Sequence, residues 1–171
     1  MSVYETLVQE IHNCTLCTLS QKRTRAVPGD GSLEAEIVFI GEGPGFYEDQ
    51  QGRPFVGPAG QLLDRMLASI GLGRQDVYVT NMVKCRPPKN RDPMPAEIDA
   101  CRGYLDKQVE MIAPKVLVTL GRFSFAKFFP GESISKARGQ PRRWRNLVIY
   151  PMYHPAAALH NPRLLPAIES D

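Results

Sequence analysis

The sequence has no long hydrophobic run and little net charge. No apolar stretch approaches the roughly 20 residues that a membrane-spanning helix needs, and the first residues lack the basic-then-apolar layout of a secretory signal. We therefore expect a cytoplasmic protein with no membrane partner. Lys and Arg together number 21 against 18 Asp and Glu, which gives a net charge of +3. Attraction to a polyanion would consequently depend on local clusters of charge.

Several nucleotide-binding and catalytic motifs are also missing. Gly41, Gly43 and Gly45 do not make the dinucleotide fingerprint, because the third glycine comes too early and we expect no helix to begin there. No glycine-rich loop ends in Gly-Lys-Ser/Thr, so hydrolysis of nucleoside triphosphates has no support. The absence of a Gly-x-Ser-x-Gly elbow argues against a serine esterase. The absence of His-x-Glu with Pro-Cys-x-x-Cys argues against a zinc deaminase.

The chain is long enough for one compact domain spanning 1–171. It has 171 residues and a hydrophobic fraction of 43%, which is enough to bury a core. The predicted strands are 37–40, 77–83, 115–120 and 147–150, and the predicted long helices are 58–70 and 95–112. This alternation predicts an α/β fold, a three-layer α/β/α sandwich around a central, mostly parallel four-stranded sheet. A last helical pattern over 163–171 breaks off, which leaves open a natural chain that extends past Asp171.

The segment Gly41–Asp64 joins the first predicted strand to the first long helix. It combines glycines and prolines with Glu42, Glu48, Asp49 and the aromatic Phe55. A loop that only connects two elements does not need glycine, carboxylates and an exposed aromatic together. Open α/β sheets bind ligands at the carboxyl ends of their strands. The segment therefore predicts a pocket for a small planar polar ligand.

Two more polar candidates follow later strands. Asn81 closes the second predicted strand and His154 follows the fourth. Each has an ordinary explanation, since asparagine is common in turns and a lone histidine is usually a satisfied structural group. A proline turn, small residues, Leu159 and Arg163 follow His154, and this context favours a functional site.

Basic residues gather in two segments. The first consists of Lys84, Arg86, Lys89 and Arg91, with two prolines and Asn90 to keep it extended. The second consists of Lys136, Arg138, Arg142, Arg143 and Arg145 around Trp144. Each segment is either a solvated face or a surface that holds phosphates, and neither decides the function alone.

The four cysteines form one close pair and one distant pair. Cys14 and Cys17 are a Cys-x-x-Cys pair, whereas Cys85 and Cys101 lie further along the chain. Disulfides are rare in cytosolic proteins, and the surroundings of Cys14 lack the other features of a thioredoxin-type redox pair. Unrelated buried thiols are the ordinary alternative. Four soft ligands favour a metal centre, and the spacing does not choose between zinc and an iron–sulfur cluster.

The motifs GEGPGFYEDQQGRPFVGPAGQLL, TNMVKCRP and YHPAAAL, together with the four cysteines, resemble the family 4 uracil-DNA glycosylases. These are iron–sulfur members of the uracil-DNA glycosylase superfamily, and the resemblance runs from Cys14 to about Leu159. It implies a monofunctional hydrolase of base excision repair, which flips uracil out of single- or double-stranded DNA and cuts its N-glycosidic bond to leave an abasic site. It also implies a monomer with a [4Fe–4S] cluster on the four cysteines, zinc being the alternative.

The resemblance implies roles for four pocket residues. Phe55 would stack on the flipped uracil. Asn81 would read the O4 and N3–H edge, because an amide offers an acceptor and a donor side by side. Glu48 would line the C5 side and exclude the thymine methyl group. His154 would donate a hydrogen bond to O2 and stabilise the negative charge that grows on the departing base.

The first motif departs from the wider superfamily at Gly43. Other branches carry an aspartate there that orients the attacking water, and family 4 members do without it. Glu42 and Glu48 are the two candidates for that task. Backbone amides around Glu42 and Gly43 would help to hold the base and the water.

The predicted DNA contacts lie on two segments. The stretch from Pro155 to Arg163 resembles a loop that enters the duplex, with Leu159 as the wedge behind the flipped nucleotide. The predicted DNA-binding residues are Arg86, Lys89, Arg91, Leu159 and Arg163.

Two alternatives to the hydrolase stay open. One is a related protein that crosslinks to uracil-DNA through a histidine on a basic loop, although Ser133–Arg145 contains no histidine. The other is a non-catalytic metal-bearing module that binds DNA through electrostatic attraction.

Overall fold

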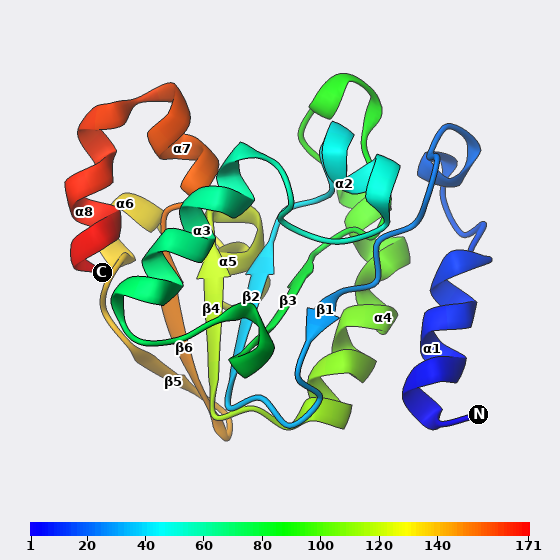
Figure 1. The fold of residues 1–171 in the computed structure, drawn as a ribbon, viewed down its shortest axis with the longest axis horizontal. Helices are drawn as coiled ribbons and strands as arrows, with labels where there is room; N and C mark the ends of the chain where they lie inside the picture. The colour runs from blue at the N-terminus through cyan, green and yellow to red at the C-terminus, as the bar shows by residue number, and fades with distance from the viewer.

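The structure, a computed structural model, describes all residues from 1 to 171. Its centre is a six-stranded sheet with the strand order β1-β3-β2-β4-β6-β5 (Figure 1). The strands are β1 (Asp30–Gly31), β2 (Ile37–Gly41), β3 (Tyr78–Asn81), β4 (Val116–Leu120), β5 (Arg142–Trp144) and β6 (Leu147–Met152). The neighbouring strands β3, β2, β4 and β6 are parallel to one another. The predicted α/β fold with a mostly parallel sheet is confirmed.

The predicted number of four strands is wrong, because two edge strands were not expected. The four predicted strands are the parallel ones, and β1 and β5 pair antiparallel to β3 and β6 at the two edges. β1 has two residues and β5 has three. Segments this short carry no measurable alternation of apolar and polar residues, so the sequence pattern does not reveal them.

Eight α-helices surround the sheet. They are α1 (Val3–His12), α2 (Phe46–Gln51), α3 (Pro58–Ser69), α4 (Pro95–Ile112), α5 (Arg122–Phe128), α6 (Ile134–Ala137), α7 (Pro155–His160) and α8 (Leu165–Ser170). Four short 3₁₀ turns lie at Thr18–Gln21, Arg74–Asp76, Pro88–Asn90 and Pro162–Leu164. Proline occupies the first position of α3, α4 and α7, where its missing N–H costs no hydrogen bond. None of the helices is long and apolar enough to cross a membrane.

The expectation that no helix begins at Gly45 is also wrong. α2 starts directly after this glycine, and the Glu48 carboxylate accepts a hydrogen bond from the Gly45 N–H at 3.0 Å. An acidic side chain three residues into a helix satisfies one of the free amide groups at its start. The six-residue helix is too short to produce a helical period in the sequence.

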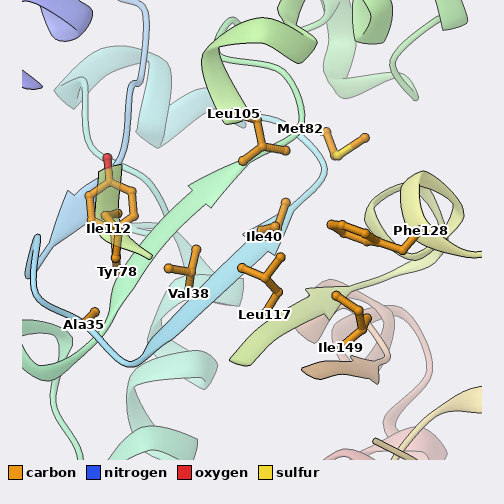
Figure 2. Close-up of a cluster of buried hydrophobic side chains, with 10 residues drawn as sticks. All are labelled: Ala35, Val38, Ile40, Tyr78, Met82, Leu105, Ile112, Leu117, Phe128 and Ile149. Atoms are coloured by element: carbon orange, nitrogen blue, oxygen red, sulfur yellow. The ribbon is translucent and has the colours of Figure 1, made fainter. Parts of the chain in front are cut away.

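The alternation of side chains along the strands divides the core between two faces of the sheet. On one face Val38, Ile40 and Leu117 pack with Leu105 of α4 and Phe128 of α5 (Figure 2). On the other face the intervening strand residues pack against α3, and this cluster consists of Phe39, Phe55, Leu63, Leu67, Val77, Val79, Val118 and Leu120. In Figure 1, α3 crosses in front of the sheet. The three-layer arrangement follows from strands that are apolar on both faces.

A fully buried lysine lies between β3 and α4. The side chain of Lys84 is 1% exposed, and its ammonium group donates to Thr80 Oγ1 at 2.6 Å, to the Asn81 carbonyl at 2.8 Å and to Gln108 Oε1 at 2.7 Å. Burial lowers the pKa of Lys84 to about 7. Lys84 therefore belongs neither to a solvated face nor to a phosphate-binding surface, the two alternatives that its basic segment suggested.

Candidate active site

A cavity of about 540 Å³ opens at the carboxyl ends of the parallel strands. Its wall contains the predicted pocket residues Glu42, Gly43, Glu48, Phe55, Asn81 and His154. They come from the end of β2, from α2 and the loop that follows it, from the end of β3 and from the start of α7. A larger groove of about 780 Å³ between α4, α5 and the β5–β6 hairpin contains none of them. The sequence thus located the residues of the pocket, and their roles stay predictions.

Asn81 presents a buried, unpaired hydrogen-bond acceptor. The residue is 2% exposed, and its Oδ1 atom has no hydrogen-bond partner. The Asn81 oxygen and the Phe55 ring both lie against Gly41, where a Cβ atom would come within 2.5 Å of the former and 2.6 Å of the latter. A buried acceptor without a partner costs about 1–3 kcal/mol. Because Asn81 lines the cavity, this oxygen is available to a ligand or a water that enters it.

Phe55 is buried, not exposed as the sequence suggested. Its side chain is 6% exposed, and its backbone adopts the left-handed conformation with φ at 53°. This conformation is unfavourable for a non-glycine residue. The guanidinium group of Arg74 fixes it by donating to the carbonyl oxygens of Phe55 at 3.0 Å and Pro54 at 2.6 Å. No sequence pattern predicts this role of Arg74, because the residue lies in the turn before β3 and binds a loop some twenty residues earlier in the chain.

Glu48 holds the other side of the same loop. One carboxylate oxygen accepts from the N–H groups of Val56 at 2.8 Å and Gly57 at 2.7 Å, and the second oxygen accepts from Gly45 at 3.0 Å. The family resemblance predicts Glu48 at the C5 side of a base and makes it a candidate for holding water. Its geometry indicates a third task, because three backbone amides already occupy both oxygens.

His154 is held as a neutral hydrogen-bond donor. Its Nδ1 accepts a hydrogen bond from the Ala156 N–H at 3.0 Å, so in the neutral ring the proton resides on Nε2. Burial lowers the pKa of His154 to about 4. The imidazole lies nearly parallel to the Phe55 ring, with centroids 5.5 Å apart and an angle of 24° between the planes. At neutral pH the pocket therefore contains an uncharged N–H donor in a fixed orientation.

Unlike Glu48 and Asp92, which also line the cavity, the Glu42 carboxylate forms no hydrogen bond within the protein. Burial raises its pKa to about 6, the negative charge of Asp92 adds to this rise, and Arg122 opposes it. Asp92 and Arg122 form an ion pair at 2.5 Å. No sequence pattern singles out Asp92, because it lies in the basic segment after β3 and comes near Glu42 only in the folded chain.

Gly43 has no room for a side chain. A Cβ atom there would come within 2.7 Å of Val83 Cγ2, well inside van der Waals contact. The branched valine side chain is itself fully buried and cannot yield easily. The aspartate that other branches of the superfamily carry at this place is therefore excluded by packing.

The predicted DNA-binding residues surround the mouth of the cavity unevenly. Leu159 on α7 is 48% exposed and lies on the cavity wall, and Lys89 and Arg163 are exposed. Arg86 donates to Asn90 Oδ1 at 2.7 Å. Arg91 pairs with Glu97 through two hydrogen bonds of 2.8 Å, which lower the pKa of that carboxyl group. Arg91 is thus partly neutralised, whereas the other basic residues have no carboxylate partner.

The second basic segment lies away from the cavity. Arg142 forms an ion pair with Glu132 and Arg138 forms one with Asp171. Trp144 is the last residue of β5 and pairs with Leu147, the first residue of β6. It therefore lies at the amino-terminal end of β6, opposite the carboxyl ends of the parallel strands. This segment does not contribute to the cavity.

Comparison with known proteins agrees with this geometry. The model of the uracil DNA glycosylase superfamily matches residues 28–169. The chain is 50% identical to the type-4 uracil-DNA glycosylase of Sulfurisphaera tokodaii, over 100% of this chain and 82% of that protein. It is 47% identical to that of Saccharolobus solfataricus, over 100% of this chain and 84% of that protein. It is 48% identical to the type-4 uracil-DNA glycosylase of Archaeoglobus fulgidus, over 100% of this chain and 90% of that protein.

The chain belongs to the type-4 uracil-DNA glycosylases. The family resemblance drawn from the motifs is confirmed. The matched family region includes every residue that lines the cavity, from Glu42 to His160.

The four cysteines gather between α1, the loop after β3 and α4. Cys85 and Cys101 are buried in a small apolar cluster against which Cys17 packs, and Cys14 is close enough to affect the pKa of Cys85. None of the four forms a disulfide. Burial raises the pKa of Cys85, and it raises that of Cys101 to about 11.

Donors of hydrogen bonds point at three of the sulfur atoms. Arg23 donates to Cys85 Sγ at 3.1 Å, and the backbone N–H groups of Lys84 and Leu16 point at Cys101 Sγ and Cys14 Sγ, each at 3.4 Å. Such donors stabilise thiolates that bind metal. No three His, Cys, Asp or Glu side chains converge as ligands of one metal ion. Four thiols with hydrogen-bond donors beside three of them are a donor set that suits a thiolate-bound metal centre.

We expect His154 of this type-4 uracil-DNA glycosylase to stay neutral throughout the physiological pH range. Its pKa is lowered to about 4, so the ring gains a second proton only as the pH falls through that value. In ¹⁵N NMR spectra of histidine-labelled protein, the His154 signals should show an unprotonated Nδ1 and should not titrate between about pH 5 and 8. The substitution His154→Gln assigns these signals. A cationic His154 ring at about pH 6 would contradict the expectation.

Proposed function

We propose that this chain hydrolyses the N-glycosidic bond of uracil in DNA and leaves an abasic site. The single observation that supports this most directly is the buried, unpaired Oδ1 of Asn81 beside the Phe55 ring at the end of the parallel strands. The names of the type-4 relatives point to the same activity. The base must leave the DNA stack to reach the cavity, which costs a few kcal/mol.

Asn81 recognises the edge of the base that distinguishes uracil from cytosine. Its Oδ1 accepts from N3–H of uracil, and its amide nitrogen donates to O4. Cytosine has an unprotonated N3 and an amino group at C4, so both contacts would fail. Lys84 fixes the Asn81 backbone by donating to its carbonyl oxygen at 2.8 Å, which supports a single orientation of the amide. Phe55 provides the flat apolar surface on which the ring stacks.

His154 stabilises the departing base. As the bond between C1′ and N1 of the base breaks, negative charge develops on the uracil ring and its O2 atom. A neutral Nε2–H donor aimed at O2 binds this charged state more strongly than the uncharged base, which lowers the barrier. The hydrogen bond from Ala156 to Nδ1 prevents the other tautomer, whose Nε2 would be an acceptor. His154 therefore acts without donating its proton fully.

Glu42 positions the attacking water. Both oxygens of Glu48 are occupied by backbone amides, whereas Glu42 lies in the same cavity with no recorded partner. A carboxylate can orient a water and take its proton as oxygen bonds to C1′. Glu48 keeps the loop of Phe55 in place. It would exclude a C5 methyl group by fixing the shape of this loop.

The four cysteines would hold a [4Fe–4S] cluster with a structural role. Four cysteine thiolates are the usual ligand set of such a cluster. The hydrogen-bond donors at the sulfur atoms and the membership in the type-4 family support this assignment. It would tie α1 and the following turn to β3 and α4. Cys85 lies four residues after Asn81, so this support extends to the pocket.

Substitution of either His154 or Asn81, the two residues proposed to form hydrogen bonds with the base, should nearly abolish excision. His154→Gln and Asn81→Ala should each lower kcat by about 10²–10³ on a uracil-containing oligonucleotide, because each removes a buried contact to the base. Alkali cleavage of abasic sites reports the reaction. The exposed residues His12 and Asn146 provide the matched controls His12→Gln and Asn146→Ala. An intact strand with the unsubstituted protein would end the proposal, and full turnover by both pocket variants would refute the residue roles.

Excision should weaken in acid through Glu42. Because its pKa is raised to about 6, the required carboxylate is present above this pH and is lost as the pH falls through it. The value of kcat/KM should fall about tenfold per pH unit below about 6. Glu42→Gln should have a low rate with no such slope, while the exposed control Glu110→Gln keeps the normal profile. If Glu48→Gln removes the slope and Glu42→Gln keeps it, the assignment is reversed.

Anaerobically purified protein should be coloured. We expect absorption near about 400 nm from thiolate-bound iron and sulfide. Cys85→Ser and Cys101→Ser should lose this absorption and lower the unfolding temperature. Thr15→Ser, between the two cysteines of the close pair, is the control that keeps both. Colourless protein that contains zinc would overturn the cluster.

A further inference from the structure

Two aromatic side chains at the mouth of the cavity have no structural task. Phe46 and Tyr47 form the first turn of α2, and they are 49% and 53% exposed. Both lie on the cavity wall. Leaving a large ring half in water forgoes roughly 1 kcal/mol of burial energy. The Tyr47 hydroxyl makes no recorded hydrogen bond, so neither ring serves the core or a polar network.

The pair is nevertheless held in a defined arrangement. The two rings meet edge to face, with centroids 5.4 Å apart and an angle of 85°, a favourable geometry for aromatic pairs. The Tyr47 ring also lies against Gly57, where a Cβ atom would come within 3.2 Å of it. The Gly57 N–H in turn donates a hydrogen bond to the Glu48 carboxylate. The aromatic pair is therefore anchored to the same loop that positions Phe55.

Positive charge accompanies the exposed rings. The Arg86 guanidinium carbon lies 5.4 Å from the centre of the Phe46 ring, while the Arg86 Nε–H is fixed by Asn90. Lys89 is exposed on the same loop. Exposed aromatic rings beside cations without a carboxylate partner are the combination that binds single-stranded nucleic acid, in which bases stack on ring faces and phosphates meet the cations.

We propose that Phe46 and Tyr47 form a stacking platform for a nucleotide next to the flipped uracil. The inference rests on the proposed function, because the platform is continuous with the cavity that receives the uracil. A neighbouring base can reach the rings only when it has left the helical stack. The platform therefore favours uracil in single strands over uracil in a matched duplex, where the neighbours stay paired and stacked.

The test compares binding to single-stranded and duplex DNA. The oligonucleotides contain 2′-fluoro-2′-deoxyuridine, which resists excision, and fluorescence anisotropy gives Kd. Stacking on an aromatic side chain contributes about 1–3 kcal/mol per base. The double variant Phe46→Ala/Tyr47→Ala should therefore bind the single strand about 10 to 100 times more weakly, and the matched duplex less than about threefold more weakly. Ile70→Ala is the control, since Ile70 is 68% exposed at the far end of α3.

A second measurement locates the stacked base. The fluorescent base 2-aminopurine is placed on either side of the uracil in the single strand, and stacking on a ring should quench it with the unsubstituted protein but not with the double variant. The variant Phe46→Tyr/Tyr47→Phe keeps both rings and should retain affinity and quenching. Equal losses on single strand and duplex, or no quenching at either position, would overturn the platform. Failure of the unsubstituted protein to excise uracil would instead refute the proposed function, and the binding comparison would still be valid.

Discussion

The ammonium group of Lys84 is the interaction on which the rest of this structure depends. It is buried without any carboxylate, and only three neutral oxygens stabilise its charge. Removing any one of them would leave a buried donor unpaired. The three acceptors belong to Thr80 and Asn81 at the end of β3 and to Gln108 on α4, so one side chain fixes the distance between the sheet and its covering helix. The next residue is Cys85, and the lysine therefore connects the cysteine region to the floor of the cavity.

The cavity itself is shaped by side chains that bind backbone. Glu48 uses both oxygens on amide groups, and Arg74 uses two nitrogens on carbonyl groups of the Phe55 loop. Between them they hold Phe55 in a conformation that a non-glycine residue avoids. The ring consequently lies against Gly41 at the end of β2, with little freedom to turn away. Pre-organisation of this kind lowers the cost of ordering the site when a base enters.

The parallel core and the pocket residues could be predicted because each leaves a pattern within a short stretch of sequence. β2 is a continuous apolar run, and β4 is apolar except for Thr119. α4 begins at a proline and ends before one, so its predicted and observed bounds coincide at Pro95–Ile112. The features that escaped prediction depend on contacts between distant segments. Nothing beside Lys84 in the sequence shows that it faces Gln108, and nothing beside Phe55 shows that Arg74 binds its carbonyl oxygen. β1 was missed because two residues form a strand only when β3 provides hydrogen bonds.

The packing around Gly43 limits which residues can supply a carboxylate to the pocket. Because Val83 occupies the space where a Cβ atom would lie, a carboxylate cannot come from this residue and must come from a neighbour with a longer side chain. In the proposed mechanism Glu42 meets that requirement, and burial raises its pKa to about 6. The same burial keeps His154 neutral. A cationic histidine would stabilise the leaving base more strongly, yet it would also stabilise the carboxylate and reduce its basicity. A neutral donor beside a more basic carboxylate is thus the combination that one poorly solvated cavity permits.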